Sequence, residues 1–370
     1  MEGDMTHIRR WLMPLSWLYG VGVDIRNALF DMGVLPSVSY DIPIINVGNI
    51  TVGGTGKTPH VEYLIRLLSD RYRIAVLSRG YKRKSRGYIL SSLSSTMEEI
   101  GDEPWQIKQK FPQVYVAVDA NRRHGIERLL TDEATKDVDI ILLDDAYQHR
   151  YVKPGHNILL VDYHRFISDD CLLPAGRLRE RASSSRRAST VIVTKCPQHI
   201  TAMGFRVILS ALRLRPYQHL FFSTFTYGTL FRLWGEGTLE LDMLRKDNMH
   251  VLLLSGIGNP LQMEQDVRRF AQHITPLSFP DHHYYSARDA EAIHQALTAL
   301  PKPHIIVTTE KDAARLQHLK GLSEEVKENT YVLPIEVSIM RDEKNKLDKT
   351  ILDYVQENTS NRRLASRKNA

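Results

Sequence analysis

The chain has 370 residues, of which 42% are hydrophobic and 25% are charged, and its formal net charge is +6. A chain of this length can bury a large core and suggests two domains. Its two cysteines exclude a disulfide framework and favour a reducing compartment, and no Cys/His cluster has the spacing of a zinc site. No run reaches the ~20 apolar residues of a membrane-spanning helix. The modest positive charge favours anionic partners, whether nucleotides, phospholipid surfaces or nucleic acid.

The N-terminal 36 residues contain a short apolar segment that follows Arg9 and Arg10. Tryptophans, flanking arginines and limited length suit a helix that lies in a membrane interface. A helix packed on the following domain explains the pattern equally well, because periodicity does not separate a lipid face from a core face. A signal peptide is disfavoured, since residues 24–27 are not a small-residue cleavage site.

Residues 48–58 form a glycine-rich stretch between an apolar run (42–47) and a helical pattern (60–68). This strand, loop and helix order is the context of a phosphate-binding loop. Backbone N–H groups of such a loop form an anion nest, to which the helix N-terminus adds positive charge. We expect Lys57 to reach the β- and γ-phosphates of a nucleotide and Thr58 to contact Mg²⁺. The predicted phosphate-binding residues are Thr51, Val52, Gly53, Gly54, Thr55, Gly56, Lys57 and Thr58.

A second apolar run, residues 138–143, ends in Asp144 and Asp145. A buried strand with a terminal acid is typical of the Walker B element, so either carboxylate would hold Mg²⁺, through water. Further strands are predicted at 74–77, 114–118, 158–161 and 190–194. Strands that alternate with helices predict an α/β fold with a P-loop NTPase-like, doubly wound parallel sheet. Ligands of such sheets bind at the carboxyl ends of the strands.

The remaining pattern predicts a second, smaller α/β domain. We expect a membrane-interface helix in 1–36, a kinase core in 37–217, the second domain in 218–355 and a disordered basic tail in 356–370. A short antiparallel pair, 221–225 with 230–234, would join the two domains. Residues 97–111 look helical throughout. The Arg-rich loop at 177–187 would clamp an acidic substrate, face an anionic membrane or form plain surface, and its charge does not decide among these.

Together, these motifs closely resemble the tetraacyldisaccharide 4'-kinase (lipid A 4'-kinase) family over roughly residues 10–320. The resemblance includes the phosphate loop with a non-glycine at Thr51. It also includes Ser78-Arg79-Gly80-Tyr81, Gly101-Asp102-Glu103-Pro104, Asp144-Asp145 with Gln148-His149, Leu173-Pro174-Ala175-Gly176, Asp281-His282-His283 and Thr309-Glu310-Lys311-Asp312-Ala313.

The resemblance implies that ATP, with Mg²⁺, phosphorylates the 4'-hydroxyl of a tetraacylated glucosamine disaccharide 1-phosphate at the cytoplasmic face of the inner membrane. The enzyme would be peripheral or monotopic, with no nucleic-acid partner. Asp102 matches the family's base, and His282 would orient it or tune its pKa. Arg122 matches a catalytic arginine that would stabilise charge on the transferring phosphoryl group, and Lys57 is counted with the catalytic residues. Weaker candidates for binding the substrate are Arg79, His149 and His283.

Two other classes of protein share part of the pattern. A membrane-surface ATPase switch of the deviant Walker A type would use the same glycine loop and an amphipathic terminus. That class places a lysine before the Gly-Gly pair, where this chain has Val52. A nucleic-acid-dependent ATPase would need a binding module that the sequence does not show.

Overall fold

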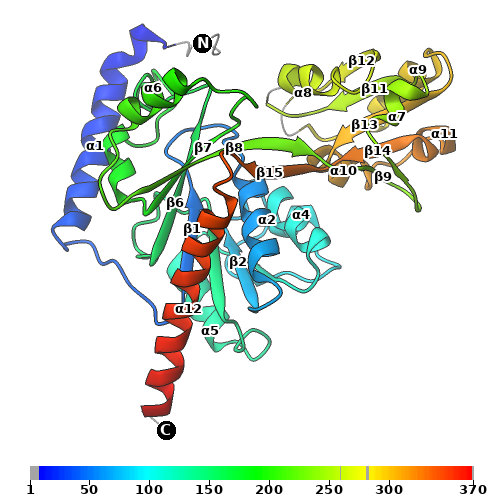
Figure 1. Ribbon diagram of the computed structural model, residues 1–370. Helices are drawn as coiled ribbons and strands as arrows, with labels where there is room; N and C mark the ends of the chain where they lie inside the picture. Colours follow the sequence, from blue (N-terminus) through cyan, green and yellow to red (C-terminus); the bar gives the residue numbers. More distant parts are fainter. Residues whose placement is uncertain (1–7, 259, 281–282, 369–370) are drawn as a thin grey trace. The chain divides into compact units, whose positions relative to one another are not determined.

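The computed structural model describes residues 8–258, 260–280 and 283–368. The chain forms two compact units (Figure 1). Unit 1 contains the residues up to Phe225 and those from Val337 onward, and unit 2 is Thr226–Glu336. Each unit is an α/β structure with its own sheet, as the sequence predicted. Within the described residues, no helix combines the length and the apolar character needed to cross a bilayer.

The sheet of unit 1 has the strand order β15-β8-β7-β6-β1-β5-β2-β4-β3. β1 pairs in parallel with both β5 and β6, so the phosphate loop leaves the middle of the sheet. The strands are β1 (Ile44–Gly48), β2 (Ile74–Ser78), β3 (Ile89–Leu90), β4 (Tyr115–Val118), β5 (Ile140–Asp144), β6 (His156–Asp162), β7 (Thr190–Thr194), β8 (His219–Tyr227) and β15 (Ile335–Ile339).

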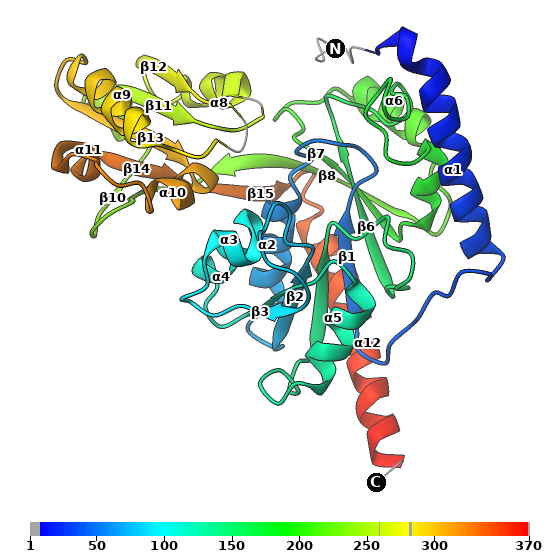
Figure 2. The same cartoon turned by 180° about the vertical axis from the view of Figure 1, so that it is seen from behind.

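Helices cover both faces of this sheet, as in a doubly wound fold. The helical segments are η1 (Arg10–Leu12), α1 (Met13–Asp31), α2 (Lys57–Leu68), α3 (Met97–Ile100), α4 (Asp102–Lys110), α5 (Arg122–Thr131), η2 (Ala182–Arg187), α6 (Ala202–Leu212) and α12 (Lys344–Lys368). Side chains of α2, α4 and α12 share one apolar core with the strands. Those of α5 and α6 pack on other clusters of strand residues. The ribbons of both helices are seen in Figure 2.

Unit 2 has a smaller sheet with the order β10-β9-β14-β13-β11-β12. Its strands are β9 (Leu230–Arg232), β10 (Thr238–Leu239), β11 (His250–Ser255), β12 (His273–Ser278), β13 (His304–Thr309) and β14 (Thr330–Leu333). Its helices are α7 (Met243–Lys246), α8 (Pro260–Val267), α9 (Ala287–Thr298), α10 (Glu310–Leu316) and α11 (Glu324–Glu328). They pack on two apolar clusters of the sheet.

The predicted antiparallel pair of 221–225 with 230–234 was wrong. β8 is a strand of the unit 1 sheet, where it pairs in parallel with β7. β9 belongs to unit 2, where it pairs antiparallel with β10 and β14. The two segments therefore do not form a pair of their own. Each finds more partners in a larger sheet, and an isolated two-stranded pair is marginally stable.

The C-terminal boundaries also differ from the prediction, since the chain returns to unit 1 at Val337 and helix α12 extends to Lys368. Leu347, Ile351 and Val355 are completely or almost completely buried in the same core as α2. Their i, i+4, i+8 spacing places them on one helix face. Packing of that face supports a helix that continues into residues expected to be disordered.

Candidate active site

The phosphate loop lies between β1 and α2, and a neighbouring segment holds its start in place. Backbone hydrogen bonds run from Val52 N to Arg177 O (2.8 Å) and from Arg179 N to Ile50 O (2.7 Å). Asn49 Nδ2 donates to Thr55 Oγ1 at 2.8 Å, inside the loop. Gly53 and Gly54 are exposed, whereas Thr55 and Thr58 are buried. The Arg-rich loop, whose role the sequence left open, thus supports the nucleotide loop.

Lys57, Asp145 and Arg179 form a charged group at the start of α2. Lys57 Nζ lies 3.7 Å from Asp145 Oδ1, and Arg179 Nη1 lies 3.1 Å from both carboxylate oxygens of Asp145. Asp145 has a φ of 49°, a left-handed conformation that aspartate adopts more readily than most residues. Two cations around one carboxylate leave net positive charge beside the phosphate loop, which suits an anionic ligand.

Asp144, the last residue of β5, is buried with one oxygen unpaired. Its Oδ2 accepts a hydrogen bond from Ser78 Oγ at 3.2 Å, while its Oδ1 is buried without a hydrogen-bond partner. Burial, followed by the charges of Glu103 and Asp145, raises the pKa of Asp144 well above its ordinary range. A buried oxygen without a partner is costly unless a ligand satisfies it.

These groups fit a Mg²⁺ ion that is shared with phosphates. In the described part of the chain, no three or more His, Cys, Asp or Glu side chains are arranged to hold a metal alone. Mg²⁺ commonly uses only one or two carboxylates, with waters and substrate phosphates as its other ligands. The unpaired oxygen of Asp144 and the buried hydroxyl of Thr58 are donors of this kind.

Asp102 is the first residue of α4, because the helix expected over 97–111 is broken at Gly101. Gly101 has φ 91° and ψ 161°, a conformation essentially restricted to glycine. It ends α3 and directly precedes α4. Asp102 and Glu103 are both half-buried there, in the first turn of α4. Glu103 acts electrostatically on Asp144, which places this turn near the end of β5.

Arg122, Arg79 and His149 are parts of one basic region beside Asp144. Arg122 is buried and donates to the backbone oxygens of Asp119 (2.8 Å) and Asp144 (3.4 Å). Burial lowers the pKa of Arg122 to about 10. His149 is half-buried, and burial followed by the charges of Arg122, Arg26 and Arg79 lowers its pKa to about 4. The structure therefore brings all three predicted residues together in unit 1.

The predicted histidines of the Asp-His-His motif belong to unit 2. His282, with Asp281, lies outside the described residues. His283 Nε2 pairs with Asp289 Oδ2 at 3.1 Å, and its ring stacks on Phe279 at a centroid distance of 4.9 Å. Through these two contacts, His283 holds the segment before α9 in place.

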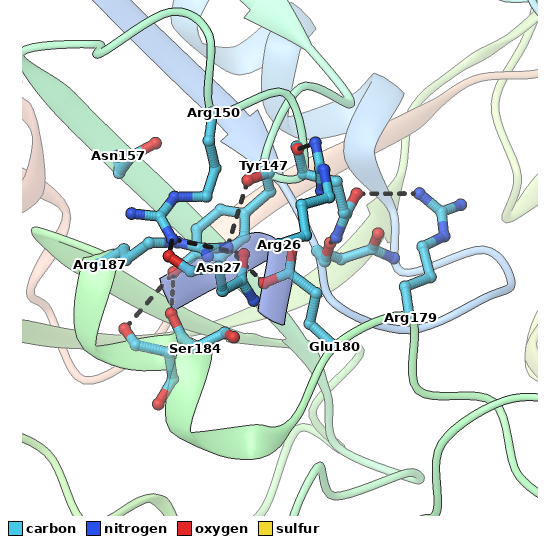
Figure 3. Close-up of polar contacts among 12 residues, drawn as sticks. Arg26, Asn27, Tyr147, Arg150, Asn157, Arg179, Glu180, Ser184 and Arg187 are labelled. Carbon is cyan, nitrogen blue, oxygen red and sulfur yellow. Dashed lines mark hydrogen bonds and ion pairs between the residues drawn. The ribbon is translucent and has the colours of Figure 1, made fainter. Parts of the chain in front are cut away.

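Helix α1 is tied to the loop that follows Asp144 and Asp145. Figure 3 shows Arg26 and Asn27 of α1 beside Tyr147 and Arg150 of this loop. Arg26 Nη2 donates to Gln148 O, and Arg150 Nη1 donates to Asn27 O, both at 2.9 Å. At the other end of α1, Ala175 N donates to Ser16 Oγ at 2.8 Å. The helix is thus anchored to the segments that support the phosphate loop and the two aspartates.

Sequence reasoning assigned no role to several residues of the site. Glu103 belongs to the same Gly101-Asp102-Glu103-Pro104 motif as Asp102, so its place in the sequence could have indicated a role in the site. Arg179 belongs to a loop whose charge alone was ambiguous. Ser78 likewise stands within the motif that contains Arg79. Thr194, which ends a strand, and His60, inside α2, carried no local signal.

Comparison with known proteins shows which family the chain is similar to. The family described as tetraacyldisaccharide-1-P 4'-kinase matches residues 8–356. Tetraacyldisaccharide 4'-kinases of Phocaeicola vulgatus and Bacteroides thetaiotaomicron are 51% and 49% identical, covering 98% and 100% of this chain and 99% of their own lengths. The crystal structure of LpxK from Aquifex aeolicus in complex with ATP has a TM-score of 0.72 and 31% identity, covering 94% of this chain and 99% of its own.

Proposed function

The chain belongs to the tetraacyldisaccharide 4'-kinase family, and from this premise we propose that it transfers the γ-phosphoryl group of ATP to the 4'-hydroxyl of a tetraacylated glucosamine disaccharide 1-phosphate. The observation that carries the proposal is the buried, unpaired Oδ1 of Asp144 beside a phosphate loop whose Lys57 faces Asp145. A buried carboxylate oxygen left unsatisfied at the end of the strand beside a phosphate loop is placed as a Mg²⁺ ligand would be.

In the reaction, the 4'-oxygen forms a bond to the γ-phosphorus while the bond from that phosphorus to the bridging oxygen of ADP breaks. We assign the hydroxyl proton to the carboxylate of Asp102. Lys57 and the backbone of the phosphate loop hold the phosphates in line with the attacking oxygen. Mg²⁺ supplies charge neutralisation on the phosphate oxygens when bound, and Asp144, Asp145 and Thr58 would hold it.

The outer face of α1 supports action at a membrane surface. Its buried positions are Ser16, Gly20 and, near the C-terminal end, Phe30, whereas most of its other large apolar side chains are exposed. Trp11 of η1 and Leu15, Leu18 and Ile25 of α1 recur at helical spacing and are 54–77% exposed. A helix that only packs on a core buries its large apolar residues instead, so this arrangement favours an interfacial helix over the alternative of simple packing.

A second helix extends the same kind of surface. α6 exposes the apolar side chains of Met203, Val207 and Leu209. Arg206 within the helix and Arg213 at its C-cap are also exposed. Both views place α6 beside α1 (Figures 1 and 2). Apolar side chains interspersed with arginines suit the interface of an anionic bilayer. We infer that α1 and α6 together contact the cytoplasmic face of the inner membrane, where the acylated substrate is embedded.

The test is ATP turnover with tetraacyldisaccharide 1-phosphate in detergent micelles, followed by mass spectrometry of the lipid. We expect ADP release that depends on the lipid and a product that carries one additional phosphate. A lipid whose 4'-hydroxyl is methylated is the matched control and should give neither result. ADP release that is unchanged by lipid, without a phosphorylated lipid, would instead support the ATPase-switch alternative and overturn the kinase proposal.

A further inference from the structure

The last glycine of the phosphate loop is held by a histidine that the loop motif does not include. The carbonyl oxygen of Gly56 accepts the backbone N–H of His60 at 3.3 Å and lies 2.7 Å from His60 Nδ1. Because a carbonyl oxygen only accepts, Nδ1 carries the proton of this neutral ring. Nε2, 3.0 Å from Ser223 Oγ, then accepts a hydrogen bond from that hydroxyl. His60 is 3% exposed, so both contacts are shielded from water.

The orientation of this carbonyl determines where the next N–H group points. A peptide unit is planar and trans, so the N–H of Lys57 points opposite to the C=O of Gly56. Since His60 holds the carbonyl on the side of α2 and β8, the Lys57 N–H is directed to the opposite side, into the loop. The preceding peptide is held in the same way, because Thr194 Oγ1 donates to Thr55 O at 2.9 Å.

The surrounding side chains leave this peptide little freedom. Gly56 has a φ of 83°, and a Cβ atom on it would lie 2.6 Å from the ring of Phe225. The glycine is therefore packed between His60 and Phe225. A flexible glycine peptide could otherwise rotate and lose its aligned N–H group.

We propose that His60 is a positioning residue for ATP binding, acting through the Gly56–Lys57 peptide. Its Nδ1–H fixes the Gly56 carbonyl so that the Lys57 N–H is pre-oriented toward a phosphate oxygen. Ser223 supports this role because its hydroxyl donates a hydrogen bond to Nε2. This hydrogen bond stabilises the tautomer in which Nδ1 carries the proton. The proposal rests on the proposed binding of ATP at this loop, but not on the identity of the phosphate acceptor.

Two substitutions of His60 separate its nitrogens. Asparagine can place an amide N–H near the position of Nδ1, whereas glutamine places its amide near Nε2. We expect His60→Gln to raise the Kd for ATP about tenfold, the equivalent of one well-aligned hydrogen bond to a charged group. His60→Asn should restore binding to within about threefold of the wild type. The KM for ATP should follow the Kd, with kcat at saturating ATP changed much less.

The experiment measures ATP binding by calorimetry without lipid, alongside thermal melting of each variant. His156→Gln is the matched control, since His156 is another buried histidine of unit 1 that contacts a threonine hydroxyl. It should leave the Kd unchanged. Thr194→Val removes the corresponding restraint on Thr55 and should weaken ATP binding in parallel, which keeps the test decisive if His60→Gln folds poorly.

Equal Kd values for wild type, His60→Gln and Thr194→Val would overturn the proposal. So would equal losses in His60→Asn and His60→Gln, because a purely structural histidine would not distinguish the two amides. If the wild type itself binds no ATP, the proposed function fails. If the wild type binds ATP but phosphorylates no lipid, only the acceptor assignment fails and the role of His60 is still tested.

Discussion

Gly80 and Gly101 pack backbone against backbone. A Cβ atom on Gly80 would lie 2.9 Å from Ile100 O, and one on Gly101 would lie 3.0 Å from Tyr81 O and 3.3 Å from the carbonyl carbon of Gly80. This contact joins two motifs that lie some twenty residues apart in the sequence. One motif contains Arg79 and the other contains Asp102. Both glycines also have positive φ, so neither position accepts a side chain without strain.

Substitution of Gly101 by alanine should therefore disturb both stability and activity. We expect Gly101→Ala to lower the free energy of unfolding by about 1–3 kcal/mol, from backbone strain and the close contact. It should also reduce kcat more than about tenfold, because Asp102 directly follows. Gly87→Ala is the control: Gly87 has a φ of 74° with no atom within 4 Å of a Cβ, so only strain applies. Urea denaturation and lipid phosphorylation check both variants, and identical behaviour of the two would contradict the packing argument.

Asp102→Asn should abolish most phosphoryl transfer without weakening ATP binding. Loss of a positioned base reduces the rate by about 10²–10⁴-fold. If Asp102 served only as a helix N-terminal acid, the substitution would cost about 0.3–1 kcal/mol of stability and leave kcat unaltered. Glu324→Gln, at the first position of α11, is the matched control for that simpler role. Single-turnover kinetics at saturating ATP distinguish the two roles.

Asp144→Asn should inactivate the enzyme while leaving the ligand-free protein at least as stable as the wild type. The pKa of Asp144 is raised in the folded state, so ionisation at neutral pH opposes folding. A neutral amide avoids this cost, yet loses the charge that would hold the metal, which we expect to reduce kcat/KM about 10²–10³-fold. Thermal melting at pH 5 and pH 8 should show a larger stability advantage of the variant at the higher pH, because the cost begins above the unfolded pKa of 3.8 and grows up to the folded pKa of about 7.

Asp162→Asn is the corresponding control for Asp144. Asp162 ends β6, which lies on the other side of β1 from β5, and pairs with Lys195 at 2.7 Å. Its replacement should reduce activity far less than that of Asp144. A comparable loss in both variants would mean that any carboxylate at this edge of the sheet has the same effect, against the metal assignment.

Acid should destabilise the protein in part through His156. Burial lowers the pKa of His156 from 6.5 to about 4, so the unfolded chain binds a proton in this range that the folded chain does not. The free energy of unfolding therefore falls as the pH falls from 6.5 towards 4, by at most about 3 kcal/mol from this residue. His156→Gln, which keeps an amide near Thr190, should flatten the pH dependence measured by urea titration. If the free energy of unfolding of the variant depended on pH as steeply as that of the wild type, the assigned contribution of His156 would be wrong.

Exposed apolar residues of α1 should contribute to membrane binding. Leu18→Ser should weaken binding to phosphatidylglycerol-containing vesicles about tenfold, the equivalent of burying one leucine side chain. Leu261→Ser, in α8 of unit 2, removes an equally exposed leucine, since Leu18 and Leu261 are 60% and 68% exposed. Co-sedimentation with vesicles should distinguish the two variants. Equal binding by both would remove α1 from the proposed membrane surface.

The sequence alone determined the α/β class, the phosphate loop and the aspartates at the end of β5. Apolar runs of five or six residues predict buried strands, and the loop between β1 and α2 has a local glycine pattern. Strand ends of a parallel sheet meet at one edge, where ligands were expected to bind. At that edge the structure places Lys57 beside Asp145, and Arg122 on the backbone oxygen of Asp144.

Only the tertiary structure decided which distant segments complete each unit and the site. Tyr354 Oη lies 3.1 Å from the backbone N of Ile44, 310 positions away, and no local pattern predicts the return of α12 to this sheet. The same holds for the bond between His60 and Ser223 and for the unpaired oxygen of Asp144. Sequence periodicity reports which face of an element is apolar, whereas the partners of a buried polar group depend on how the faces pack.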